Sequence, residues 1–486
     1  MNITVLNGSP KGNTSVTLQY VHFIQKKFPQ HQLKIHNISE RIKSIEKEEK
    51  RFQEVIDDIQ ASDGVLWAFP LYYYLVASQY KRFIELIWER DAKEIFKNKY
   101  TAVLTTSIHF FDHTAHNYMH AICDDLNMNY VGFFSAEMYD LLRRKGREMF
   151  ILFAQNFFEA IEKKIPTAKS YPSLTYRKFD FIPNGIKAEK IDPHHKKIVI
   201  LTDSEDPQTN LGKMIERLRA SFSNGVEVTN LHQIEILGGC LGCMQCGYDY
   251  ECSYGGKDEF MEFYKSRVKA ADILIFAGSI KDRYLSSRWK LFFDRSFFNT
   301  HTPSLIGKQI GFLISGPLSQ IPNLKQIFEA YTEWQQANLA GFVTDECEDS
   351  LQLDALLQIF AERLIQWSLT NYIKPRTFLS VGGMKVFRDD IWGRIRFPFQ
   401  ADHKFYKEHG LYDFPQKDYK ARIISGILIL LTKIPSMRKE IYQKRMKSEM
   451  IKPFQKILGE QDRLKNFKCQ TSNDKSNPKL KYQKYS

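Results

Sequence analysis

The chain has 486 residues, of which 43% are hydrophobic and 26% charged, and its formal net charge is +13 at pH 7. This length predicts two or three domains, and the composition excludes global disorder and collagen-like or mucin-like classes. The charge is uneven, because residues 371–486 hold 26 Lys and Arg against 11 Asp and Glu, a net of +15, while the remainder of the chain carries −2.

The N-terminal residues show neither the basic start nor the long apolar stretch of a signal peptide. The longest apolar run, 423–431, is far shorter than the ~20 residues of a membrane-spanning helix. Seven cysteines, four of them in one loop, do not indicate an oxidised secreted framework. We therefore expect a cytoplasmic protein.

Residues 1–165 alternate short apolar strands with amphipathic helices. Strands are expected at 3–7, 32–38, 64–69, 100–106 and 130–134, and helices at 15–27, 46–60, 79–89, 113–126 and 147–163. Five strands separated by helices predict an α/β fold with a doubly wound parallel sheet.

Residues 166–195 are rich in Pro, Lys and Tyr and are interpreted as a linker, after which the pattern restarts. Strands are then expected at 197–203, 226–231, 272–277 and 308–314, and helices at 211–222, 258–269, 287–298, 323–337 and 351–369. Residues 61–66 match 270–275, and residues 80–85 match 289–294. The sequence therefore predicts a tandem duplication.

The predicted domains are repeat 1 (1–165), the linker, repeat 2 (196–372), a basic and mainly helical C-terminal extension (373–465) and a disordered tail (466–486).

The loop 7–15, between the first strand and helix, reads Asn-Gly-Ser-Pro-Lys-Gly-Asn-Thr-Ser. Its glycines, its small hydroxyl and amide side chains and the following helix N-terminus favour a phosphate monoester. Neither a Walker loop nor a dinucleotide Gly-x-Gly-x-x-Gly is present. The alternative is a plain strand–turn–helix with an N-cap.

This loop resembles the FMN phosphate loop of the NADPH-dependent FMN reductase superfamily, which has a flavodoxin-like fold. A second block of that family is matched by Asp63-Gly64, by 70–73 and by 81–85. The resemblance covers about residues 1–370 and implies two tandem flavodoxin-like five-stranded sheets. The FMN ligands that it implies are Ser9, Lys11, Asn13, Thr14, Ser15, Pro70, Leu71, Tyr72, Tyr73 and Ser107.

Four cysteines, Cys240, Cys243, Cys246 and Cys252, lie within thirteen residues. Soft thiolates so closely spaced suit an iron–sulfur cluster or zinc, and one compact loop favours [4Fe–4S] over the two separated Cys pairs of structural zinc. The spacing is also similar to the cluster motif of the iron–sulfur flavoproteins, a branch of the same superfamily. Zinc and a metal-free dithiol are the alternatives.

Four histidines, His109, His113, His116 and His120, fall in and just before one predicted helix. No carboxylate spacing completes a metal site there, so we interpret them as structural.

These features predict a flavin-dependent oxidoreductase that takes electrons from NAD(P)H, with FMN in repeat 1 and a [4Fe–4S] cluster in repeat 2. In repeat 2 the loop equivalent to 7–15 carries Asp203, Glu205 and Asp206, whose charges would repel a phosphate. Each repeat would then hold one cofactor, and electrons would cross the repeat interface.

We name no general acid or base. The alternatives are a simple NAD(P)H:quinone or nitro-compound reductase without a cluster, and a non-catalytic zinc-bearing binding protein.

The expected partners are a small molecule or a protein that donates or accepts electrons, and no nucleic acid, since no binding module is recognised. The chain is expected to be a monomer with an internal pseudo-dimer, or a homodimer. In the basic extension the run 423–431 is expected to pack onto the flavodoxin-like body. Contact with a membrane surface is the less favoured alternative.

Overall fold

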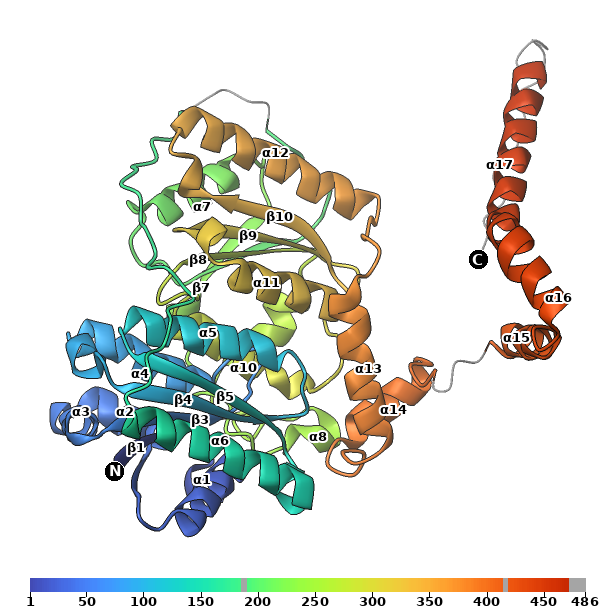
Figure 1. Ribbon diagram of the computed structural model, residues 1–486. Coiled ribbons are helices and arrows are strands. Elements are labelled where there is room, and N and C mark those ends of the chain that lie inside the picture. Colours follow the sequence, from blue (N-terminus) through green and yellow to red (C-terminus); the bar gives the residue numbers. More distant parts are fainter. Residues whose placement is uncertain (185–189, 414–417, 472–486) are drawn as a thin grey trace. The chain divides into compact units, whose positions relative to one another are not determined.

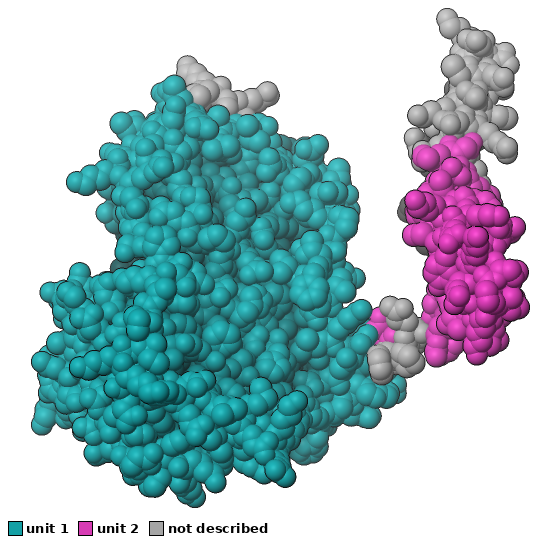
Figure 2. Space-filling model, in the orientation of Figure 1, with its two compact units in different colours: residues 1–412 teal, residues 413–486 magenta. Residues whose placement is uncertain are grey.

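The computed structural model describes residues 1–184, 190–413 and 418–471. The chain divides into two compact units, residues 1–412 and residues 413–486, coloured teal and magenta in Figure 2. The first unit contains both sheets (Figure 1). The second unit consists of helices in its described part.

The first sheet is parallel and has the strand order β2-β1-β3-β4-β5. Its strands are β1 (Asn2–Asn7), β2 (Gln32–Asn37), β3 (Gly64–Pro70), β4 (Tyr100–Ser107) and β5 (Asn129–Glu137). Central β3 is buried along nearly its whole length, as expected for a parallel strand with helices on both faces.

The second sheet is also parallel, and its order β7-β6-β8-β9-β10 repeats the first. Its strands are β6 (Ile198–Thr202), β7 (Val226–Asn230), β8 (Ile273–Ser279), β9 (Gln309–Ser315) and β10 (Asn338–Thr344). The two sheets confirm the predicted fold class and the tandem duplication.

Helices cover both faces of each sheet. Repeat 1 has α1 (Val16–Lys27), α2 (Ile38–Lys47), α3 (Glu49–Ala61), α4 (Ser78–Glu89), α5 (Asp112–Asp125) and α6 (Arg144–Glu162). Repeat 2 has α7 (Asn210–Ala220), α8 (Cys246–Asp249), α9 (Phe260–Phe263), α10 (Ser287–Arg295), α11 (Pro322–Trp334) and α12 (Ser350–Leu369). The outer faces, under α1 and α6 and under α7 and α12, have separate apolar cores.

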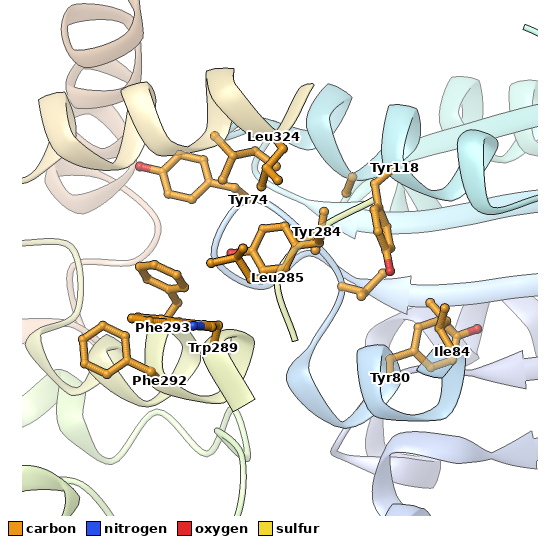
Figure 3. Close-up of a cluster of buried hydrophobic side chains, with 14 of the residues drawn as sticks. Tyr74, Tyr80, Ile84, Tyr118, Tyr284, Leu285, Trp289, Phe292, Phe293 and Leu324 are labelled. Carbon is orange, nitrogen blue, oxygen red and sulfur yellow. The ribbon is translucent and has the colours of Figure 1, made fainter. Parts of the chain in front are cut away.

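The inner faces of the two repeats share one apolar core (Figure 3). Tyr74, Tyr80 and Tyr118 of repeat 1 lie in the same cluster as Tyr284 and Trp289 of repeat 2. All five side chains are almost fully buried. Burying each large side chain contributes about 1.5–3 kcal/mol, so the repeats are held together by the same hydrophobic burial that stabilises each of them.

Two predicted helices differ in the structure, and one strand was not predicted. The segment after β2 forms two helices, α2 and α3, where one at 46–60 was expected, because the apolar residues of α2 recur at helical spacing and are buried. The helix expected at 258–269 begins at Phe260 and passes into a wider π turn, Tyr264–Val268. Strand β10 lies outside every predicted range, because Gly341 interrupts it and shifts its register against β9.

The predicted extension is split between the two units. Helices α13 (Phe378–Trp392) and α14 (Gln400–Glu408) belong to the first unit, while α15 (Tyr419–Leu431), α16 (Pro435–Lys439) and α17 (Met446–Thr471) lie in the second. The predicted tail starts inside α17, and residues 472–486 lie outside the described part. No helix in the described ranges has the length and apolar character needed to cross a membrane.

Candidate functional site

The loop after β1 leads into the first turn of α1. Ser15 stands at the N-cap of α1, and its side chain makes no capping hydrogen bond. The first N–H groups of an α-helix have no partner within the helix, and they carry the positive end of its dipole. Since Ser9 and Ser15 are buried beside these groups, the loop forms a cradle for an anion.

The cradle opens into a cavity of about 390 Å³ at the carboxyl ends of the strands of repeat 1. This volume is in the usual range for a small-molecule or cofactor site, and its place matches the rule for open α/β sheets. Repeat 1 lines it with Ser9, Lys11, Ser15, Val16, Thr17, Pro70, Leu71, Tyr72, Tyr73, Tyr74, Thr106, Ser107, Ile108, Phe110, Met138 and Tyr139.

Eight of the ten residues implied by the family resemblance therefore lie at this cavity. Asn13 and Thr14 are not among its lining residues. Both are exposed in the short turn before α1, where Asn13 Oδ1 accepts from Asn37 Nδ2 at 3.0 Å and Thr14 Oγ1 donates to the carbonyl of Lys11 at 2.8 Å. The turn directs these two side chains toward solvent.

The cysteine loop of repeat 2 contacts the same cavity. Met244, between the second and third cysteines, is one of its lining residues. At Gly242 an added Cβ would collide with Tyr72 Oη and stand 2.9 Å from Lys11 Cε, so only glycine allows this approach. Gln79 Nε2 of α4 donates to the carbonyl of Cys240 at 3.2 Å. The folded chain thus places the cysteines of one repeat against the cavity of the other.

The four thiols of this loop influence one another electrostatically. Burial, followed by the charges of Asp294, Cys252 and Cys243, raises the pKa of Cys240 to about 12, against the opposing hydrogen bond from the N–H of Gly242. The pKa of Cys246 is also raised, first by burial and then by the other three cysteines. No three His, Cys, Asp or Glu side chains of the described residues are arranged to hold a single metal ion. Four neighbouring thiols are nevertheless the donor set that an iron–sulfur cluster requires.

The equivalent loop of repeat 2 uses its polar groups within the protein. At the N-cap of α7 the Thr209 side chain accepts from the Gly212 N–H at 3.2 Å, which is the bond that Ser15 does not make. Asp203 accepts from the indole N–H of Trp289 at 2.9 Å and from the Ser286 hydroxyl. Its pKa is raised by burial. The loop after β1 presents such groups to a cavity, whereas this loop uses them in its own packing.

The turn after the third strand of each repeat shows the same contrast. In repeat 1 this turn supplies Tyr72, Tyr73 and Tyr74 to the cavity. The corresponding turn of repeat 2, marked by the same bridge pattern, is Lys281-Asp282-Arg283. Its three charged side chains pair with repeat 1: Lys281 Nζ with Glu89 at 2.5 Å, Asp282 with Lys81 at 3.3 Å and Arg283 Nε with Asp125 at 2.5 Å. In repeat 2 the turn therefore binds the other repeat.

The linker packs against the start of α7 in repeat 2. Asn210, the first residue of α7, accepts from the N–H of Phe181 and donates to the carbonyl of Phe179, both at 2.8 Å. Phe181 is fully buried. A pocket of about 170 Å³, lined partly by linker residues, remains open there. This is less than half of the cavity in repeat 1.

His301 is a cavity residue that the sequence interpretation missed. Its Nδ1 lies 2.7 Å from Asp402 Oδ2 in α14, and Asp402 is fully buried. Tyr406 donates to the His301 carbonyl at 2.8 Å. With Nδ1 held by a carboxylate, Nε2 is the ring nitrogen left for a ligand in the cavity. His301 and the loop after β1 belong to different repeats, which explains why no local spacing revealed the histidine.

The C-terminal helices of the first unit complete the cavity wall. Phe387 of α13 and three residues of the following segment, Ile395, Pro398 and Phe399, line it. Repeat 2 adds Met244, Phe297, Thr300, His301 and Trp334. The many Phe, Trp and Pro residues in 387–399 were the only sequence feature that could have indicated a cavity wall there. Aromatic residues are equally common in cores, so this composition did not distinguish the two.

The four histidines near α5 have separate partners. His109 Nδ1 lies 2.9 Å from Asp112, His113 Nε2 lies 3.3 Å from Gln326, and His116 Nε2 lies 2.7 Å from Thr105 Oγ1. His120 stacks on the Tyr130 ring. Their different surroundings agree with a structural interpretation.

Residues 1–149 match the family model described as the flavodoxin-like fold. This match confirms the predicted flavodoxin-like fold of repeat 1, and the identical strand order extends it to repeat 2. Among curated proteins none matches the chain significantly.

Solved structures with similarity to the chain include three flavoenzymes. The apo form of the NADH:FMN oxidoreductase EMOB is 15% identical, with 32% of this chain and 87% of that chain covered and a TM-score of 0.28. The NAD(P)H:(acceptor) oxidoreductase FerB from Paracoccus denitrificans is 17% identical, with 33% and 97% covered and a TM-score of 0.27. The FMN-dependent NADH-azoreductase from Bacillus anthracis is 12% identical, with 34% and 99% covered and a TM-score of 0.24. Each likeness spans about one repeat.

Proposed function

We propose that this protein is a flavin-dependent oxidoreductase with one FMN in the cavity of repeat 1 and one [4Fe–4S] cluster on the cysteine loop of repeat 2. NAD(P)H is the proposed electron donor, and the acceptor is a small molecule or a protein. Electrons would cross between the two cofactors inside one chain.

The observation that carries this proposal is the contact between the two candidate sites. Gly242 lies against Tyr72 and Lys11, and Met244 lines the cavity itself. The pKa of Tyr72 is raised first by burial and then by the charge of Cys240. This cavity side chain therefore interacts electrostatically with the cysteine loop. A cofactor at the cavity and a cluster at the thiols would thus be neighbours without any movement of the chain.

The cavity residues fit FMN by their chemistry. The free N–H groups at the start of α1, with Ser9, Ser15 and Lys11, suit the phosphate. Pro70 and Tyr72 offer an apolar wall to a planar ring. When bound, FMN supplies hydride and one-electron chemistry, and a [4Fe–4S] cluster supplies single-electron transfer.

His301 is the group placed to handle a proton. Asp402 holds Nδ1 and so fixes the orientation of the ring, which leaves Nε2 to exchange a proton with an acceptor in the cavity. Phe110, Trp334 and Phe387 contact one another and form an aromatic part of the cavity wall. A planar acceptor that gains electrons and a proton together suits this arrangement.

The test is an anaerobic purification in which iron, sulfide, zinc and FMN are counted per chain, with a visible spectrum. We expect one FMN, four irons and four sulfides. The Cys243→Ala variant should lose iron and sulfide and keep one FMN, while Cys347→Ala, a cysteine outside the loop, should keep both.

Other counts identify the alternatives. FMN without iron would support a simple quinone or nitro-compound reductase. Zinc without FMN would support a binding protein with a structural metal. Two FMN per chain would contradict the division of work between the repeats.

A further inference from the structure

The helices of the second unit carry a large apolar surface. Helix α15 lies wholly within the described ranges and buries none of its residues, although eight of its thirteen are Ile, Leu or Tyr. Ile423, Ile427 and Leu430 recur at helical spacing and are 65%, 54% and 61% exposed. A helix this apolar is ordinarily buried in a core or at an interface, so its surface calls for a partner.

Helix α17 repeats the pattern with a clearer division of faces. Met450, Phe454, Ile457 and Leu458 stand at positions i, i+4, i+7 and i+8, and each is more than half exposed. Residues at these spacings lie on one side of a helix. Lys452 and Lys456 fall on the other side. This part of α17 is thus amphipathic, whereas α15 is apolar on all sides from Ile423 to Leu431 apart from Ser425 and Gly426.

Positive charge accompanies these apolar faces. Residues 419–459 contain ten Lys and Arg and two acidic residues, Glu440 and Glu449. Glu440 already pairs with Lys444 and Arg445, and Glu449 pairs with Lys452. Ten cations against two anions leave a net charge of +8 beside exposed apolar side chains.

An anionic lipid surface can bind both the apolar side chains and the positive charges of these helices. Amphipathic helices with basic polar faces lie in the plane of the membrane interface, with apolar side chains among the acyl chains and Lys or Arg at the headgroups. Each such cation is attracted to an anionic leaflet. No helix in the part of the chain that the structure describes could span the bilayer.

We propose that residues 419–458, the C-terminal arm, dock the protein on anionic lipid membranes. The docking is independent of the proposed redox function, since the lining residues of the cavity described above all precede the arm. Folding of the arm onto the flavodoxin-like unit, or pairing with a second copy, are the competing occupants of its apolar faces.

The test is sedimentation of the full chain with phosphatidylcholine vesicles that contain or lack phosphatidylglycerol. We expect binding to the anionic vesicles at least about tenfold tighter than to the neutral ones, and loss of binding at high salt. The Leu430→Glu variant should bind about 100-fold more weakly, because a charge replaces a leucine that enters the acyl chains. Leu152→Glu is the control, since Leu152 of α6 is 59% exposed but lies outside the arm.

Three results would overturn the proposal. The first is no binding of the unaltered chain to anionic vesicles at low salt. The second is a Leu430→Glu chain that binds as tightly as the unaltered one. The third is a Leu430→Glu chain that changes from dimer to monomer in light scattering, or unfolds at lower urea, which would assign the apolar face to a second copy or to the flavodoxin-like unit. Should that variant fail to fold, the salt and lipid dependence of the unaltered chain still decides.

Discussion

Glu85 accepts two hydrogen bonds from Ser287, one from its backbone N–H and one from its hydroxyl, each 2.5 Å long. Glu85 belongs to α4 of repeat 1, and Ser287 begins α10 of repeat 2. Asp294 near the end of α10 returns the contact by accepting from the N–H of Ser78 at the start of α4, at 2.6 Å. Each repeat thus caps a helix of the other, which is the isologous arrangement of a twofold dimer within one chain.

Replacing Glu85 by alanine should destabilise the pair of repeats strongly. Lys81 is fully buried and donates to Glu85 at 3.0 Å, so the substitution leaves Asp282 to balance its charge and also removes the cap of α10. We expect a loss of about 3–5 kcal/mol in the free energy of unfolding, measured by urea titration. Glu94→Ala, which breaks the exposed pair with Lys97, should cost no more than about 0.5 kcal/mol. Equal losses of unfolding free energy in the two variants would show that the buried pair at the repeat interface stabilises the protein no more than an exposed pair.

Gly242→Ala should weaken flavin binding, and Gly256→Ala should not. Both glycines have positive φ, +63° and +69°, so alanine costs each about 1 kcal/mol of backbone strain. An added Cβ meets Tyr72 only at Gly242, while nothing lies within 4 Å at Gly256. Displacing Tyr72 by such overpacking should raise the FMN dissociation constant about tenfold, measured by flavin fluorescence. Similar constants for the two variants would mean that the cysteine loop does not shape the cavity.

The stability of the first unit should fall in mild acid because of His116. Burial lowers the pKa of His116 to about 4, below the ordinary value of about 6.5 in an unfolded chain. Between these values the unfolded state binds a proton that the folded state refuses, so the free energy of unfolding decreases as the pH falls from about 6.5 to about 4, then levels off. The decrease should be about 3 kcal/mol, since one pKa unit corresponds to about 1.4 kcal/mol. His116→Gln should flatten this slope in urea titrations, and the exposed His195→Gln should retain it. An unchanged slope in His116→Gln would assign it to other groups.

His301→Gln should lower turnover about 100-fold while the flavin content stays constant, because a general acid is lost and no phosphate contact changes. Asp402→Asn should reverse the imidazole tautomer and shift the pH profile of kcat/KM, a change that a purely structural role of Asp402 would not cause. His403→Gln is the control, since this histidine of α14 does not line the cavity and its Nδ1 lies 2.7 Å from Tyr412 Oη. A normal pH profile in Asp402→Asn would exclude the proposed proton path.

Local sequence patterns predicted much of each repeat. A short apolar run such as 64–69, bounded by turn residues, favours a strand buried on both faces, and the four cysteines lie in one loop. Neither prediction needs information from elsewhere in the chain. The loop after β1 was recognisable for the same reason. Asn13 and Thr14 show the limit of that reasoning, because the turn before α1 directs them to solvent rather than into the cavity. Strand β10 was missed because its glycine interrupts the apolar run.

The neighbours of the site depend on the packing of the two repeats. Periodicity predicted two repeats, the first with a doubly wound parallel sheet, and the family resemblance made them flavodoxin-like. Loop composition singled out the loop after β1 and the four cysteines. These patterns could not place Gly242 against Tyr72, or His301 at the cavity that begins at Ser9, since these residues are far apart in the chain. Such contacts arise where two apolar faces fit together and cap each other's helices, and this long-range complementarity has no period along the sequence.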